Sequence, residues 1–291
     1  MATSLASSQA AQGKPSRRLR VLKSLFERRS AAFGTTVVLF FLLVALLGPL
    51  LAPYGANEQI LSEARQPPSL QRPFGTDHIG RDVFSRVVLG ARDIFVLAGV
   101  GTLLAVVAGT IIGLLASYLG GLTEELTFRF FDSVLAMPAL LFALLLMGTF
   151  GPSRGNVLIV ITVAYIPIVA RVVRSVVLPV KTKDYVAAAR MQGEPITRII
   201  FREILPSVLP ALAVESALRF SYAIFLVASL GFLGAGVQPP NPDWGLMISE
   251  ARTFVSLTPW SLYFPAAAIS LLVISVNLMA DGLKSVLQGQ A

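Results

Sequence analysis

The polar segment KDYVAAARMQGEPITRIIFREILP, residues 183–206, favours helix and lies between two runs apolar enough to cross a bilayer. Thr182 is expected to cap a first helix, because its hydroxyl accepts a backbone N–H, and the residues that follow are mostly good helix formers. Gly193 ends this helix by taking the left-handed conformation. Pro195 suits the first turn of a second helix, which is expected to stop before Pro206. The segment therefore predicts two short helices with a break between them.

The second helix has one apolar face and one charged face. Ile196, Ile199, Ile200 and Ile204 recur at i, i+3, i+4 and i+8, while the charged residues fall elsewhere around the helix. In the first helix, the run 187–189 is all alanine, so the backbone of a partner could approach closely there. Two interpretations remain open from this chemistry, namely a helix that rests on the membrane surface and an element that docks onto a partner.

The composition is that of an integral membrane protein. The chain has 291 residues, of which 55% are hydrophobic and 14% charged, and its mean hydropathy is +0.73. Apolar runs of about 20 residues, the length that crosses a bilayer core, predict six spans, at residues 33–52, 94–118, 130–150, 156–179, 208–234 and 262–287. We expect one all-α membrane domain over residues 33–291.

The placement of the net charge of +8 predicts the orientation of the chain. The tail over residues 1–32 and the segment 182–206 are both rich in Lys and Arg, and loops of that kind stay in the cytoplasm. Four spans separate the two, so they share one side, and both termini are expected to be cytoplasmic. The tail lacks interleaved aromatic residues and runs directly into a span, so we expect a short interfacial helix that faces the lipid bilayer and no contact with nucleic acid.

Two loops long enough to carry function fall on the outer side, at residues 53–93 and 235–261. The first contains FGTDHIGRDVFSR from Phe74, which indicates an ordered turn followed by an amphipathic helix. The second contains VQPPNPDWG from Val237, in which three prolines stiffen an extended path and Trp244 is expected to be an interface anchor.

Polar residues within the predicted spans carry information because they are costly in lipid. Three sets stand out, and each is explained either by pairing between helices or by lining a transport pathway: Glu215 with Arg219, Arg129 with Asp132, and Asn277 with Asp281. None of these sets identifies a substrate.

Several kinds of chemistry have no residues to support them. The chain has no cysteine and a single histidine, His78, which excludes thiol nucleophiles, zinc sites of the H-E-x-x-H kind and a Ser-His-Asp triad within the membrane. No G-x-x-x-x-G-K-[ST] sequence occurs, so we expect no ATP hydrolysis by this chain itself. We predict no catalytic residue, no bound metal and no cofactor held by this chain.

The chain resembles the permease subunits of binding-protein-dependent ABC importers, and among them the C-type subunit of the dipeptide and oligopeptide group. The cytoplasmic loop of that family carries E-A-A, three residues, G, nine residues and I-x-L-P, and five positions match here: Ala188, Ala189, Gly193, Leu205 and Pro206. Ala187 stands in place of the glutamate and Glu203 in place of the isoleucine. The segments FGTDHIGRDVFSRVVLGAR, SLGFLGAGVQPPNPDWG and NLMADGL are also similar to that group.

The resemblance implies the type I ABC importer permease fold and a subunit of a heteromeric complex in the bacterial inner membrane. A second, related permease, two cytoplasmic ATPase subunits that hold ATP and Mg, and an extracytoplasmic substrate-binding protein would be the partners. The segment 182–206 would be the coupling helix that docks on an ATPase subunit, with contacts from Tyr185, Ala187, Ala188, Ala189, Gly193, Leu205 and Pro206. We expect Asp243 and Trp244 to face the binding protein.

The resemblance further implies import of short peptides, while related permeases serve nickel, glutathione or sugars. A secondary transporter or channel that works without partners is the alternative that six spans and scattered internal charges leave open.

Overall fold

The computed structural model describes residues 28–288, which form helices joined by loops, without a β-sheet among them. The helices are α2 (Arg29–Leu51), α3 (Val83–Leu119), α4 (Gly121–Leu135), α5 (Ala139–Phe150), α6 (Arg154–Val180), α7 (Asp184–Met191), α8 (Ile196–Arg198), α9 (Leu205–Phe232), α10 (Trp244–Ala251) and α11 (Trp260–Gln288), with short turns η1 (Leu61–Glu63), η2 (Ile199–Ile204) and η3 (Arg252–Phe254). The all-α prediction is confirmed for this part of the chain. The predicted interfacial helix of the N-terminal tail lies outside the described residues.

Five of the six predicted spans are single helices long and apolar enough to cross a membrane, and the third is not. The predicted third span over 130–150 contains a break, because α4 and α5 meet at an angle of 86°. Pro138 immediately precedes α5 and has no N–H to continue a helix, and it also disfavours helical geometry at Met137. This pair crosses as one broken span or turns back within the bilayer.

Helix α3 begins at Val83, within the predicted loop 53–93, where the sequence analysis expects an ordered turn followed by a helix. The carboxylate of Asp82 caps the helix by accepting a hydrogen bond of 2.7 Å from the backbone N–H of Ser85. The 37 residues of α3 are about 55 Å long at 1.5 Å per residue, which exceeds the hydrocarbon core by a wide margin.

Small residues hold α3 against α6 at close range. Gly101, Ala105, Gly109 and Gly113 recur every four residues along one face of α3, and Ala105 is fully buried. A Cβ atom added at Gly113 would lie 2.9 Å from the backbone oxygen of Ala170 on α6. The two backbones therefore touch, which is how helices pack in lipid, where burial of apolar side chains gives little driving force.

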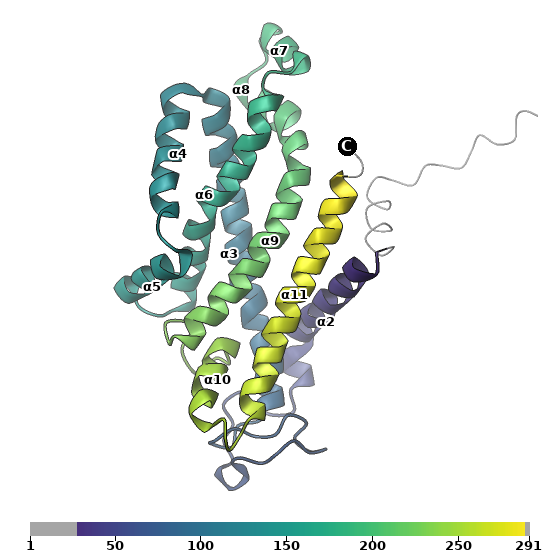
Figure 1. Ribbon diagram of the computed structural model, residues 1–291, viewed down its shortest axis with the longest axis vertical. Helices are drawn as coiled ribbons and strands as arrows, with labels where there is room; N and C mark the ends of the chain where they lie inside the picture. Colours follow the sequence, from purple (N-terminus) through teal and green to yellow (C-terminus); the bar gives the residue numbers. More distant parts are fainter. Residues whose placement is uncertain (1–27, 289–291) are drawn as a thin grey trace, which may run out of the picture.

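The helices run along the long axis of the molecule, and the connections gather at its two ends (Figure 1). At one end lie α7 and α8, and the C-terminal end of α11 lies toward them; at the opposite end lie α10 and the loop that precedes α3. Helix α9 runs between α6 and α11, and α5 lies across the axis near the lower part of α9 in this view. We refer below to the α7–α8 end and to the α10 end.

Candidate functional site

The turn between α7 and α8 is a capped helix end built around Gly193. Its φ of +74° is the left-handed conformation predicted for this glycine. The backbone N–H of Gly193 donates to the oxygen of Arg190 at 3.0 Å, and the N–H of Glu194 donates to the oxygen of Ala189 at 3.2 Å. This pair of bonds is the Schellman pattern that satisfies the last carbonyls of a helix. Pro195 follows as the residue that precedes α8.

Two details of the predicted segment are wrong. Thr182 does not cap α7: its hydroxyl donates to the backbone oxygen of Pro179, and Lys183 is the residue before the helix. The second helix does not stop before Pro206, because α8, η2 and α9 form one continuous rod of 37 residues. The turn η2 is π-helical, with the Leu205 N–H bonded to the Ile200 oxygen five residues earlier, and this widened turn accommodates a proline that cannot donate.

The predicted isoleucine face packs the segment 182–206 against the long helices α3 and α6. Ile199, Ile200 and Ile204 are buried and pack in one apolar cluster with valines of α6 and with Leu114 of α3. Ile196 is half exposed, so the predicted face is one residue too long. Val186 of α7 is fully buried in the same cluster, a contact that our sequence analysis missed although its spacing of three residues from Ala189 indicates a common face.

A further contact ties α7 to the end of α3. The Nε of Arg190 donates to the phenolic oxygen of Tyr118 at 3.2 Å, and the guanidinium lies 4.8 Å from the centre of that ring. The segment is therefore held on both of its helices, by apolar burial under α8 and η2 and by this contact beside α7.

The opposite side of the segment is exposed. Tyr185 is 42% and Met191 83% exposed, and Gly193 has open space where a side chain would project. Of the three alanines, Ala187 is exposed, Ala188 is half-buried and Ala189 is buried, so the first of them is the one a partner's backbone could approach most closely. Leu205 is half-buried and Pro206 exposed, both at the start of α9.

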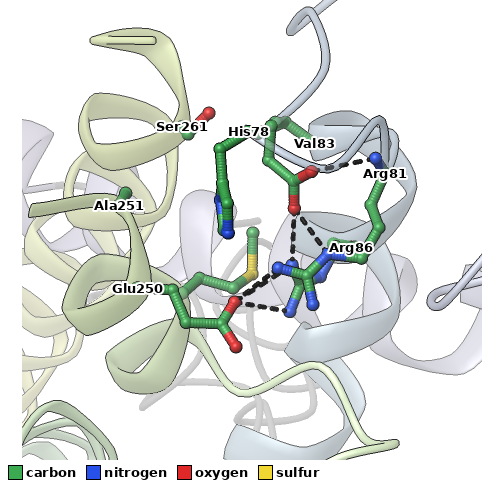
Figure 2. A pocket seen from close by; sticks show the side chains of 9 residues that line it. His78, Arg81, Val83, Arg86, Glu250, Ala251 and Ser261 are labelled. Atoms are coloured by element: carbon green, nitrogen blue, oxygen red, sulfur yellow. Dashed lines mark hydrogen bonds and ion pairs between the residues drawn. The ribbon is translucent and has the colours of Figure 1, made fainter. Parts of the chain in front are cut away.

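The α10 end contains a compact cluster of charged side chains that our sequence analysis did not find (Figure 2). Asp77 accepts from Arg81 at 2.5 Å and from Arg86 at 3.0 Å, and Glu250 of α10 accepts from Arg81 at 2.6 Å. His78 stacks on Phe254 with the ring centres 4.3 Å apart. The cluster joins the loop that precedes α3, the start of α3 and the end of α10.

Electrostatics keeps this cluster charged. Burial by itself raises the pKa of Asp77, but the charge and hydrogen bonds of Arg81, together with the charge of Arg86, outweigh it and hold the pKa of this carboxyl below its usual value near 3.8. Two carboxylates face two guanidinium groups, so the net charge is zero. The cavity beside them has a volume of about 10 Å³, which is the space of one water molecule.

The side chains of Asp243 and Trp244 do not face outward, so the expectation that they meet a binding protein is wrong. Both are fully buried. The indole Nε1 of Trp244 donates to the backbone oxygen of Val87 at 2.9 Å, and the ring packs edge to face on Phe41 of α2. The Asp243 carboxylate caps α10 by accepting from the Leu246 N–H at 2.8 Å, and burial raises its pKa to about 6. Asp243 thus stabilises the start of α10, and Trp244 packs it against α2 and α3.

The polar residues within the spans have different environments. Glu215 and Arg219 pair as predicted, with 2.7 Å between Oε1 and Nε. Arg129 and Asp132 each pair elsewhere, Arg129 with Glu125 on the same helix and Asp132 with Arg171 of α6. On α11, Asn277 is half-buried and Asp281 is exposed.

Helix α9 has an open face, on which Tyr222 and Phe225 are exposed, and a concave surface lies beside it. Its cavity has a volume of about 380 Å³ and is formed by residues of four helices: Leu140 of α5; Phe225, Ala228, Ser229, Phe232 and Leu233 of α9; Ile248 of α10; and Ala266, Ile269 and Ser270 of α11. Apolar side chains dominate this lining, and two serine hydroxyls are its polar groups.

Comparisons with known proteins agree over most of the chain. Residues 105–289 match the profile of the family described as binding-protein-dependent transport system inner membrane component, and residues 16–68 match that of the N-terminal transmembrane domain of oligopeptide transport permease C. The chain is 39% identical to a dipeptide transport system permease protein of Alkalihalophilus pseudofirmus over 91% of this chain and 87% of that protein. Identity is 37% to the Haemophilus influenzae protein of the same name, over 90% of each chain. It is 36% to a di/tripeptide transport system permease protein of Pseudomonas aeruginosa, over 91% of this chain and 89% of that protein.

Proposed function

This chain belongs to the family of binding-protein-dependent transport system inner membrane components, and we propose that it is the membrane permease subunit of an ATP-driven importer for short peptides. The relatives that carry dipeptide or di/tripeptide transport in their names are 36–39% identical over nine tenths of this chain, which supports peptides as the substrate class. The proposal also draws on the capped segment 182–206, which projects from the α7–α8 end of the molecule.

In this proposal the exposed side of the segment docks on a cytoplasmic ATPase subunit. Ala187 and Gly193 leave room for close approach of a partner, while Tyr185 and Met191 supply apolar area beside them. ATP and Mg are held by the two ATPase subunits and not by this chain. A second, related permease completes the membrane part of the complex, and a substrate-binding protein delivers peptide at the α10 end.

The helix geometry supplies a means of coupling. The rod from Ile196 to Phe232 is about 55 Å long and starts at the proposed docking surface. Its far end lines the cavity beside α10 and α11. Displacement of α8 by closure of the ATPase subunits would therefore move the wall of that cavity as a rigid body, which is the kind of motion that alternating access requires.

The orientation follows from the same assignment. The segment 182–206 and the C-terminal end of α11 lie toward one end of the molecule, and the basic loops favour the cytoplasm for that end. Both termini would then be cytoplasmic in the bacterial inner membrane.

The proposal is tested by isolating the chain with what it binds. We would tag it in its native membrane, extract it in mild detergent, identify the co-purifying proteins by mass spectrometry and assay ATP-dependent dipeptide uptake. We expect a second permease and ATPase subunits in the preparation, and we expect Ala187→Glu on the docking surface to remove the ATPase subunits. Leu70→Glu is the matched control, because Leu70 is fully exposed in the outer loop.

Two results would contradict the proposal. One is a stable chain that purifies free of ATPase subunits and transports under an ion gradient without ATP, which is the behaviour of a secondary transporter. The other is an intact complex that imports a different solute, such as nickel or glutathione, and no peptide.

A further inference from the structure

An ion pair lies at the edge of the open face of α9, in the middle of the rod. The carboxylate of Glu215 and the guanidinium of Arg219 approach to 2.7 Å, and their side chains are 12% and 15% exposed. At 100° per residue, Glu215 points within about 20° of Tyr222 and Arg219 within about 60° of it. Tyr222 is 54% exposed, so the pair borders a surface that this chain leaves uncovered.

The pair keeps hydrogen-bonding capacity to spare. Within residues 28–288, Arg219 Nε and Glu215 Oε1 are buried atoms without a hydrogen-bond partner, so the pair must separate before either atom bonds to a solute. The guanidinium lies 4.7 Å from the ring centre of Tyr222 and 5.7 Å from that of Tyr165, and these aromatic faces offer attraction without accepting a directed hydrogen bond from each donor.

Charged groups within a membrane helix are costly, and those that occur pair with one another or line substrate and ion pathways. The same face of α9 continues toward the cavity of about 380 Å³, with Phe225 and Ser229 on successive turns after Tyr222. A solute that leaves the cavity along α9 toward the α7–α8 end therefore meets the ion pair.

We propose that Glu215 and Arg219 bind the two charged ends of a dipeptide as it passes: Glu215 takes the α-ammonium group and Arg219 takes the α-carboxylate. This inference rests on the proposed function as a peptide importer. The two charged groups lie 2.7 Å apart in the closed pair, whereas two extended residues span about 7 Å. The side chains start about 6 Å apart along the helix axis, so the pair opens to admit the two ends of a dipeptide. The peptide replaces one internal ion pair by two charge-assisted contacts, one of which has the bidentate form that arginine favours with carboxylates.

The assignment predicts that the side chains of a dipeptide have little effect on whether the permease transports it. Both contacts are made to groups that every dipeptide carries, and the apolar cavity accommodates varied side chains without directed bonds. Arg219 and Glu215 are expected to set the preference for a free carboxylate and a free ammonium group, whereas the binding protein sets the affinity with which peptide is first captured.

The test uses the complex purified with its binding protein and reconstituted in vesicles, with labelled alanyl-alanine as the transport probe. A second dipeptide that carries a photoreactive diazirine side chain identifies contact residues by mass spectrometry. The variants are Arg219→Gln and Glu215→Gln. The matched control is Arg129→Gln, because Arg129 pairs with Glu125 at the same spacing on α4, where both side chains are exposed.

We expect ATP-dependent uptake by the unaltered complex and photolabel on α9 between Glu215 and Ser229. At saturating binding protein, each of the two variants is expected to reduce maximal uptake and labelling by at least about tenfold, which corresponds to the loss of one charge-assisted hydrogen bond. The subunit composition and the rate of ATP hydrolysis are expected to be unchanged. If Arg219→Gln fails to assemble, Arg219→Lys, which keeps the charge and loses the bidentate fork, replaces it under the same labelling criterion.

The inference is overturned if uptake proceeds normally in both variants, or if the unaltered complex transports dipeptide and the label is absent from α9. Failure of the proposed function gives a different result, since the unaltered complex would then take up no dipeptide in the presence of ATP.

Discussion

Substitution of Gly193 tests whether the turn between α7 and α8 must keep its shape. The residue has a φ of +74°, and a Cβ added to it would meet no atom within 4 Å. The cost of a substitution therefore comes from backbone strain alone, at about 1–2 kcal/mol for an ordinary residue in the left-handed region. Asparagine tolerates that region and costs less, whereas valine, which is β-branched, costs more.

This strain stays local, because the two hydrogen bonds of the turn join residues of the same segment. A penalty of 1–2 kcal/mol multiplies the population of the rearranged turn by about 5–30. We expect Gly193→Asn to import peptide almost normally, Gly193→Ala to lose several-fold and Gly193→Val to lose more. The rate of ATP-dependent uptake by the reconstituted complex is the measurement, with expression in the membrane as the check on folding.

A matched control exists at the turn that precedes α6. Gly151 has a φ of +82° and a ψ of 159°, a conformation that only glycine adopts readily, and its surroundings are equally open, so Gly151→Ala carries at least as much strain away from the segment 182–206. Its uptake is expected to stay close to that of the unaltered protein. The reasoning is refuted if all three Gly193 variants transport alike, or if Gly151→Ala reduces uptake as much as Gly193→Ala does.

Three further predictions concern packing, charge and orientation. Gly113→Leu is expected to force α3 away from α6 and to prevent accumulation of the protein in the membrane, as measured by immunoblotting. Gly148→Leu, at an open position, is expected to accumulate normally. Equal amounts of the two variants would contradict the close backbone packing of α3 with α6. Asp77→Asn is expected to destabilise the α10 end by about 3–5 kcal/mol at neutral pH, since it leaves two buried arginines facing one carboxylate, that of Glu250. Because the pKa of Asp77 is lowered in the folded state, the stability that its carboxylate contributes is fully present above about pH 3.8 and is lost as the pH falls below that value. The difference in thermal unfolding temperature between variant and parent should therefore shrink in acid. A difference that does not vary with pH would count against the ion cluster. The chain has no cysteine, so Leu70→Cys and Ala187→Cys each create a unique thiol. A membrane-impermeant thiol reagent is expected to label the first in intact cells and the second only after permeabilisation, and the opposite pattern would reverse the proposed orientation.

Much of the segment 182–206 was predictable because its shape depends on local chemistry. The left-handed glycine, the break and the buried face of Ile199, Ile200 and Ile204 all follow from backbone preferences and from helical spacing. The error at Pro206 has a physical cause. A proline in the sequence ordinarily signals the end of a helix, but the π-helical turn η2 lets the rod continue through it, and that turn is stabilised by burial against α3 and α6.

The α10 end of the molecule was predicted less well because its contacts join distant parts of the chain. Trp244 in a proline-rich loop has the composition of a surface anchor, yet its indole is enclosed by α2 and α3. The ion cluster depends on Glu250, which is more than 160 positions from Arg81 and Arg86 in the sequence. The spacing of four residues between Asp77 and Arg81 allows these two to pair. No local signal in the sequence identifies Glu250 as a member of the same cluster.

The sequence by itself determined that this protein is an all-α membrane protein, where its long apolar helices lie and where a capped turn interrupts them. Those properties arise from hydropathy summed over about 20 residues and from the conformational limits of single residues. Only the tertiary structure decided that α4 and α5 bend apart, that Asp243 and Trp244 are buried, and that the Glu215–Arg219 pair borders an open face. These depend on which helices meet, and the close packing of α3 with α6 and of α9 with its neighbours selects one arrangement from many that the same apolar runs allow.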